Sequence, residues 1–162
     1  MRQRTWQLIA LATLLVLTGC GRGGSEPGEA RQASLSDPSH QDFGNYQLHF
    51  NAVRSDELSP EAARAYGIER SANRVLLNVS MLRKEPDGRT TPVDGVVSAT
   101  AHNLNGQLKD LRVRRVTEGA SVYFIGEVGI AGAEILVFDI EATPEGETNP
   151  YTVQFKREFF AD

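Results

Sequence analysis

The sequence predicts an all-β domain over residues 42–162, an antiparallel immunoglobulin-like β-sandwich of about seven strands with one short helix after the first strand. Two observations predict this fold class. Short segments in which apolar and polar residues alternate recur along the domain, and such alternation is typical of half-buried strands. Turn-forming glycine, proline and asparagine separate the segments at roughly regular spacing, as they do in β-sandwiches. A small closed barrel is the alternative architecture.

The first predicted strand covers residues 46–52, where the alternation is strict. Tyr46, Leu48, Phe50 and Ala52 share one face, and the residues between them are polar. Because successive side chains of a strand point to opposite faces, the apolar set is expected to face the core.

A short helix is predicted from Pro60 to Tyr66. Ser59 suits the N-cap, and proline is favoured at the first helical position. Gly67 provides the stop signal, since glycine readily adopts the left-handed conformation at a helix end. We expect this helix to connect one sheet with the other.

Six further strands are predicted after the helix. Pro86-Asp87-Gly88 and Asn105-Gly106 mark turns between them, the second being a typical hairpin signal. The segment 153–160 alternates and is a candidate for pairing at a sheet edge. The predicted strands are 74–84, 93–104, 107–116, 122–128, 134–142 and 151–160.

Residues 1–19 are typical of a lipoprotein signal peptide. Arg2 and Arg4 precede an apolar run over residues 6–17. That run is too short to span about 30 Å of hydrocarbon as a helix, and its layout is that of a secretory signal. The following Leu17-Thr18-Gly19-Cys20 resembles the bacterial lipobox, the pattern read by the lipoprotein signal peptidase.

Cys20 is therefore expected to carry the lipid and to begin the mature chain. It is the single cysteine of the sequence, so an intrachain disulfide does not account for it. Two or more acyl chains anchor a protein stably to a membrane. Gly21, in place of an aspartate, favours the outer membrane, with the domain in the periplasm. An ordinary secreted protein with an incidental cysteine is the alternative.

Residues 20–41 are predicted to comprise the lipidated cysteine and a flexible tether. The segment is rich in Gly, Ser, Pro, Glu and Gln, and Leu35 is its one large aliphatic residue. Such a composition cannot bury enough apolar surface to offset the entropy of ordering. His40, at its end, is interpreted as incidental.

Charge argues against nucleic acid as a partner. Two of the 17 basic residues and none of the 21 acidic residues precede Cys20. The mature chain is therefore acidic, whereas nucleic-acid binding requires a basic footprint. The same balance offers no attraction to anionic lipid, so membrane attachment is expected through the acyl chains on Cys20 alone.

Several segments of the domain resemble the family called domain of unknown function 4426. One departure is at Val53 and Arg54, where the family pattern has an aromatic residue after the Asn-Ala pair. The resemblance implies a small exported bacterial protein, often a lipoprotein, whose biochemical role is not established, and it transfers no catalytic residue. The matching segments are Tyr46–Ala52, Leu58–Ile68, Arg70–Val79, Asn103–Gln107, Glu118–Phe124 and Val153–Phe160.

The resemblance singles out a polar corner around the helix and its flanking strands. Its residues can line a shallow recognition surface, or they can cap the helix and satisfy buried backbone, and we favour the second interpretation. The candidate binding residues are Asn51, Tyr66, Arg70, Ser71 and Asn78.

Two other groups are candidates for binding. His49 and His102, both on predicted strands, are weak candidates for a zinc or copper site, the alternative being local packing of surface histidines. Arg112 and Arg114 are expected to share a face of the predicted strand 107–116, with Arg115 beside them. This basic cluster can bind an anionic partner, or it can protect an exposed strand from edge pairing.

The sequence contains no catalytic or cofactor signature, so no cofactor and no enzymatic activity are expected. The interpretation is a lipid-anchored periplasmic β-sandwich that acts as a binding or accessory module for an envelope partner. The alternative is a periplasmic copper or zinc carrier, or a small enzyme, on the same fold.

Overall fold

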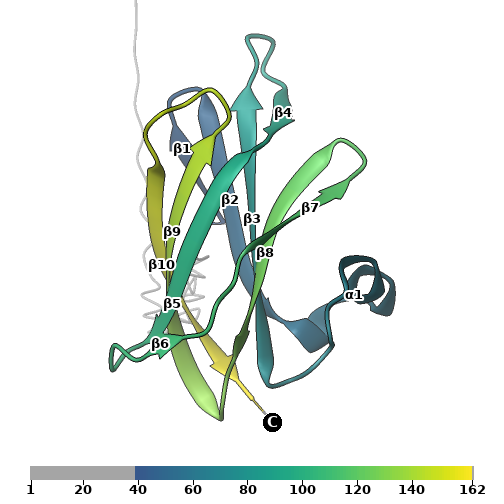
Figure 1. Cartoon of the computed structure of the whole chain (residues 1–162), viewed down its shortest axis with the longest axis vertical. Helices are drawn as coiled ribbons and strands as arrows, with labels where there is room; N and C mark the ends of the chain where they lie inside the picture. The colour runs from purple at the N-terminus through teal and green to yellow at the C-terminus, as the bar shows by residue number, and fades with distance from the viewer. Residues whose placement is uncertain (1–38, 162) are drawn as a thin grey trace, which may run out of the picture. The chain divides into compact units, whose positions relative to one another are not determined.

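The computed structural model describes residues 39–161, which form ten strands, one α-helix and one short 3-10 helix. The strands make two separate antiparallel sheets stacked as a sandwich (Figure 1). The all-β sandwich prediction is confirmed, with ten strands among the described residues in place of the expected seven or so, and the strands do not close into a barrel. The predicted signal peptide, Cys20 and most of the predicted tether lie outside the described residues.

Six strands form the first sheet, here called sheet A. In sheet A the order is β1-β2-β3-β8-β7, and β4 pairs with the C-terminal end of β3, residues 81–84. Register places His40 opposite His49, and Asn51 opposite Asn78. The members are β1 (His40–Phe43), β2 (Tyr46–Arg54), β3 (Arg74–Lys84), β4 (Thr90–Val93), β7 (Arg114–Glu118) and β8 (Ser121–Gly129).

Four strands form the second sheet, sheet B, in the order β10-β9-β5-β6. β9 and β10 pair along the whole of β10, whereas β6 pairs only with Ala101 and His102 of β5. Both β10 and β6 are edge strands, which agrees with the edge position expected for segment 153–160. The members are β5 (Gly95–Asn103), β6 (Leu108–Lys109), β9 (Ala133–Pro144) and β10 (Tyr151–Phe160).

The core lies between the sheets and is built by the alternating apolar residues. Phe50 of β2 and Phe138 of β9 each approach Phe155 of β10 with ring centroids 5.0 Å apart. These rings join the two sheets, and each buried aromatic side chain contributes a large apolar area. The largest fully buried apolar side chains are Phe138, Leu48, Leu77, Met81, Leu136, Ile140, Val75, Val79 and Val128.

Helix α1 (Pro60–Tyr66) has the predicted bounds and lies beside sheet A (Figure 1). It connects β2 with β3, which pair in sheet A, so the expected connection from one sheet to the other is wrong. Ser59 accepts a hydrogen bond from the backbone N–H of Ala62 at 3.1 Å, and Gly67 ends the helix at φ 64°. A second, smaller cluster of buried residues, Ala63, Ile68, Leu76 and Ile125, attaches the helix to the outer face of sheet A. Neither helix of the described residues is long and apolar enough to cross a membrane.

Three boundaries differ from the sequence prediction. The predicted strand 93–104 is divided between β4 of sheet A and β5 of sheet B, and Asp94 stands at the crossing. The predicted strand 107–116 is likewise divided into β6 and β7, on different sheets. In addition, β1 takes in His40 and Gln41, which the sequence assigned to the tether.

Candidate functional site

The polar outer face of β1, β2 and β3 holds three of the residues that the sequence singled out. Asn51 and Asn78 are direct cross-strand partners, and His49 lies opposite Ser80 in the neighbouring row. These four residues, with Ser39 and Phe50, line a shallow depression. We call this surface the β1–β3 polar face.

Arg157 of β10 reaches this face from the other sheet. Its Nη1 donates to Asn51 Oδ1 and to the carbonyl oxygen of Ala52, both at 2.6 Å. Asn78 Oδ1, next to Asn51, is buried without a hydrogen-bond partner among the described residues. The two asparagines thus have different roles, since Asn51 accepts from an arginine that links the sheets while the Asn78 oxygen stays unpaired.

His40 and His49 face each other across β1 and β2. Their ring centroids are 5.3 Å apart, with an interplanar angle of 23°. His49 Nε2 lies 2.6 Å from Gln47 Oε1, and Gln47 Nε2 donates to Asp42 Oδ1 at 3.0 Å. Partial burial lowers the pKa of His49, and the nearby His40 lowers it further. A lowered pKa favours the neutral imidazole.

His49 and His102, the two metal-ligand candidates from the sequence, belong to different sheets and are not brought together. His102 lies on the outer face of sheet B, with its Nε2 3.3 Å from Asp139 Oδ2 and its Nδ1 3.0 Å from the carbonyl oxygen of Asn103. Among residues 39–161, no group of three or more His, Cys, Asp or Glu is arranged to hold a metal ion.

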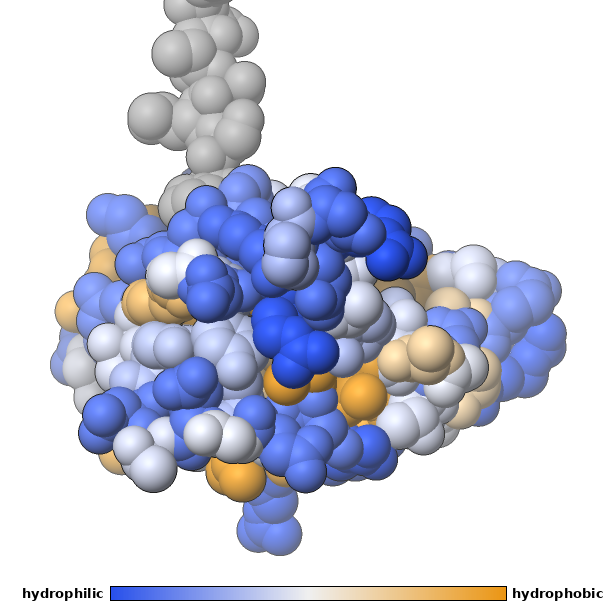
Figure 2. Space-filling model, turned by 90° about the horizontal axis from the view of Figure 1, so that it is seen from above, coloured by the Kyte–Doolittle hydropathy of each residue, from blue (hydrophilic) through white to orange (hydrophobic). Residues whose placement is uncertain are grey.

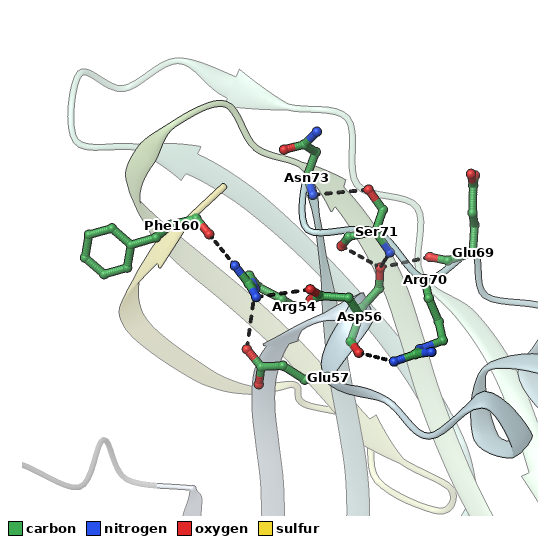
Figure 3. A network of polar contacts seen from close by, with 9 residues as sticks. Arg54, Asp56, Glu57, Glu69, Arg70, Ser71, Asn73 and Phe160 are labelled. Atoms are coloured by element: carbon green, nitrogen blue, oxygen red, sulfur yellow. Dashed lines mark hydrogen bonds and ion pairs between the residues drawn. The ribbon is translucent and has the colours of Figure 1, made fainter. Parts of the chain in front are cut away.

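Arg70 and Ser71 belong to a separate network around the 3-10 helix η1 (Ser55–Glu57) (Figure 3). Ser55 is fully buried, and its Oγ accepts from the backbone N–H of Ser71 at 2.9 Å. The same Oγ lies 2.8 Å from the carbonyl oxygen of Glu69. Arg70 Nη2 donates to the carbonyl oxygen of Asp56 at 2.6 Å. Ser71 Oγ in turn accepts from the backbone N–H of Asn73 at 3.1 Å, so Arg70 and Ser71 both hold backbone groups in place.

Arg54 extends this network to the end of β10 (Figure 3). Its Nη1 donates to the carbonyl oxygen of Phe160 at 2.7 Å, and its Nη2 donates to Asp56 Oδ2 at 3.0 Å. The departure from the family pattern noted at this position therefore places a cation where the two sheets meet.

Tyr66 lies apart from the β1–β3 polar face, at the end of α1. Its hydroxyl donates to Glu118 Oε2 of β7 at 2.5 Å, and this hydrogen bond, together with burial, raises the pKa of Tyr66 to about 12. Arg114 donates to the carbonyl oxygen of Tyr66 and so satisfies a terminal carbonyl of the helix.

The prediction that Arg112 and Arg114 share a face of one strand is wrong. Arg112 precedes β7 in the connection from sheet B to sheet A, and its side chain is 91% exposed beside Asp110. Arg115 pairs with Asp94. The three arginines thus have separate partners. Arg112 and Arg114 line one shallow depression, but Asp110 and Glu127 line it too, so its charge is mixed.

Sequence reasoning missed His40, Ser55 and Arg157. Ser55 gave no signal, because burial of one hydroxyl depends on the loop that packs over it. His40 lies in β1, which has only four residues, and a strand this short gives too little alternation to be predicted from the sequence. The sequence places Arg157 on a strand, but it does not indicate that the side chain contacts Asn51 and Ala52 of the other sheet.

Comparison with known proteins gives one family and one fold. A family model described as "Domain of unknown function (DUF4426)" matches residues 40–162. A crystal structure of a DUF4426 family protein from Pseudomonas aeruginosa PAO1 is 33% identical, with TM-score 0.65, over 76% of this chain and 94% of that one. No curated protein matches the chain.

Two structures of FetP from uropathogenic Escherichia coli strain F11 share the fold. One, of protein expressed in the E. coli periplasm, is 12% identical with TM-score 0.53, over 76% of this chain and 94% of FetP. The other, a copper-bound variant of FetP, is 13% identical with TM-score 0.51, over 74% and 93%. At this identity the likeness concerns the fold.

Proposed function

Because the chain belongs to the DUF4426 family, whose function is unknown, we propose that it is a lipid-anchored periplasmic lipoprotein whose sandwich binds an envelope partner. In this proposal Cys20 carries the acyl chains, and the described domain makes the contact. The role is that of a binding or accessory module and involves no catalysis.

The free edge of β5 is the observation that carries the proposal. β6 pairs only with Ala101 and His102, so residues 95–100 of β5 have β9 as their single neighbouring strand among the described residues. A strand edge of this kind offers backbone N–H and C=O groups to an added strand. At its start, Val96 is 71% exposed, so an apolar side chain is available beside the backbone groups.

The opposite edge of sheet B is less accessible. Tyr151, at the start of β10, stacks on Phe43 with ring centroids 4.6 Å apart. At the other end, the carbonyl oxygen of Phe160 accepts from Arg54. Both ends of β10 are therefore attached to sheet A, which leaves β5 as the preferred edge.

The surface seen from above is mostly hydrophilic, with small hydrophobic patches between the polar groups (Figure 2). This view shows no broad apolar surface of the kind that marks an obligate interface. On this face a partner would find small apolar patches and no broad apolar contact area.

Site-specific photo-crosslinking in intact cells tests the edge. A photoreactive residue replaces Ser98 of β5 in the full-length protein, and the control replaces Thr152 of β10. Both positions lie in one cross-strand row, at opposite edges of the same sheet, with Glu141 between them. We expect a reproducible envelope protein to be captured from position 98 and not from position 152. Equal capture from both positions, or from neither, would count against strand addition at β5.

The anchor has its own experiment, because it can fail independently of the partner. Cys20→Ser should abolish labelling by radioactive or alkyne-tagged fatty acid and should release the protein from the membrane fraction. Normal membrane fractionation of this variant would contradict the lipoprotein assignment and would leave the β5 edge untouched.

A further inference from the structure

We propose that His40 and His49 together bind a divalent transition-metal ion on the outer face of β1 and β2. This inference goes beyond partner binding and does not depend on it. It rests on the placement of two imidazoles by one β-hairpin and on the hydrogen bonds that orient one of them.

The hairpin places the two ligands. His40 and His49 are direct partners in the antiparallel register of β1 and β2. The Cβ atoms of such partners are about 4.5–5.5 Å apart, and the two rings lie on one side, with centroids 5.3 Å apart. Two imidazole nitrogens must lie about 2.0–2.1 Å from a common ion, and the hairpin places both rings on the same side of the sheet.

A relay of hydrogen bonds orients His49. Gln47 Nε2 donates to the Asp42 carboxylate, which turns Gln47 Oε1 toward His49. An amide oxygen can only accept, so His49 carries its proton on Nε2, and Nδ1 keeps the lone pair. Histidines that bind metals typically donate their other ring N–H in this way, and the partner fixes both tautomer and ring orientation.

Charge near the pair is balanced. Asp42 ends the relay, and Lys84 Nζ lies 2.9 Å from its Oδ1. Because Lys84 and Gln47 engage Asp42, we do not count its carboxylate as a ligand. The proposed ligands are two imidazole nitrogens, and water completes the coordination. Imidazole suits late first-row ions, and their affinities rise toward Cu²⁺, which exceeds Zn²⁺. The expected ligand is thus Cu²⁺ in preference to Zn²⁺.

Titration of the full chain with Cu²⁺ and with Zn²⁺ tests the site. The protein is expressed with its own leader, purified as the cell processes it and kept free of any histidine tag. Calorimetry measures stoichiometry and affinity, and the Cu²⁺ absorption spectrum reports nitrogen ligation. We expect one strong Cu²⁺ site per chain, weaker Zn²⁺ binding, and at least a tenfold loss of Cu²⁺ affinity in both His40→Ala and His49→Ala.

His102→Ala is the matched control, because His102 is also a strand histidine at the surface but lies on the other sheet. It should bind Cu²⁺ as the parent does. Gln47→Ala tests the relay, since loss of orientation should weaken binding less than loss of either ligand. Melting curves without metal establish that each variant is folded.

Three results would overturn the proposal. They are no saturable Cu²⁺ binding by the parent chain, unchanged affinity in folded His49→Ala, and an equal loss of affinity in His102→Ala. None of them affects strand addition at β5, which the crosslinking experiment addresses separately.

Discussion

Arg115 holds Asp94 through both carboxylate oxygens, with its Nε 2.9 Å from Oδ1 and 3.0 Å from Oδ2, and its Nη2 2.5 Å from Oδ2. Asp94 is the residue at which the chain leaves β4 of sheet A for β5 of sheet B. The bidentate contact therefore fixes the crossing between the sheets to β7, an edge strand, in the geometry that an arginine and a carboxylate favour.

Replacing Asp94 should make the protein less stable in a pH-dependent way. The hydrogen bonds from Arg115 lower the pKa of Asp94 below its ordinary value of 3.8, with help from the backbone N–H of Gly95. A lowered carboxyl pKa stabilises the fold above the ordinary value, and this contribution is lost as pH falls through the lowered pKa. Asp94→Asn should therefore lower the Tm at pH 7, and the difference from the parent should shrink below pH 3.8.

Asp110→Asn is the control for this experiment. Asp110 is 85% exposed and lies 3.5 Å from Arg112, and an exposed pair of this kind contributes little. Thermal melts from pH 2 to 7 are the measurement. A difference between Asp94→Asn and the parent that does not change with pH would contradict the ion-pair explanation.

Gly95→Ala should be among the most destabilising substitutions in the domain. A Cβ at this position would lie 2.2 Å from the carbonyl oxygen of Thr143 and 2.9 Å from Met81 Cε. The first contact is with backbone of β9, which cannot move without disturbing its pairing with β5. Forcing an extra carbon into a packed site costs about 1–3 kcal/mol.

Urea denaturation gives the free energy of unfolding for this comparison. The control is Gly129→Ala, because a Cβ at Gly129 meets nothing within 4 Å. We expect that variant to unfold at nearly the parent urea concentration. If the two alanine variants proved equally stable, the close approach of β5 to β9 at Gly95 would be contradicted.

Ser55→Ala should weaken the corner that joins η1 to the loop before β3. The substitution removes the oxygen that accepts from the Ser71 N–H and the hydroxyl beside the Glu69 carbonyl. A buried backbone group left without a partner costs about 1–3 kcal/mol. Urea denaturation should show a loss of this size, whereas Ser98→Ala at an exposed position should show almost none. Ser55→Thr keeps the hydroxyl oxygen and adds a methyl group. It therefore distinguishes the loss of the hydrogen bonds from a change in packing.

Alkaline titration should identify Tyr66 as a late-ionising tyrosine. The hydrogen bond to Glu118 raises its pKa to about 12. A raised pKa stabilises the fold below the ordinary value of 10.0, and that contribution is lost as pH rises toward 12. Absorbance near 295 nm should therefore lose a component with a midpoint of about 12 in Tyr66→Phe. Glu118→Gln should shift that component to lower pH, and an unchanged curve in either variant would contradict the contact.

Local sequence determined the elements whose signals lie within a few residues. Ser59, Pro60 and Gly67 define both ends of α1, because capping and left-handed conformations are decided by neighbouring backbone. Alternation of apolar and polar residues likewise predicts the bounds of β3 and β10, residues 74–84 and 151–160, because it too is a local pattern. The family assignment, too, followed from segments read in order along the chain.

Tertiary structure alone decided which strands are neighbours, and the site depends on that. Asp94-Gly95 interrupts the apolar pattern of residues 93–104, but only long-range pairing shows that β4 belongs to sheet A and β5 to sheet B. His49 and His102 look equivalent in sequence and lie on different sheets, whereas His40 becomes the partner of His49 through the register of one hairpin. Alternation specifies the face on which a side chain lies, but only long-range pairing specifies what lies beside it.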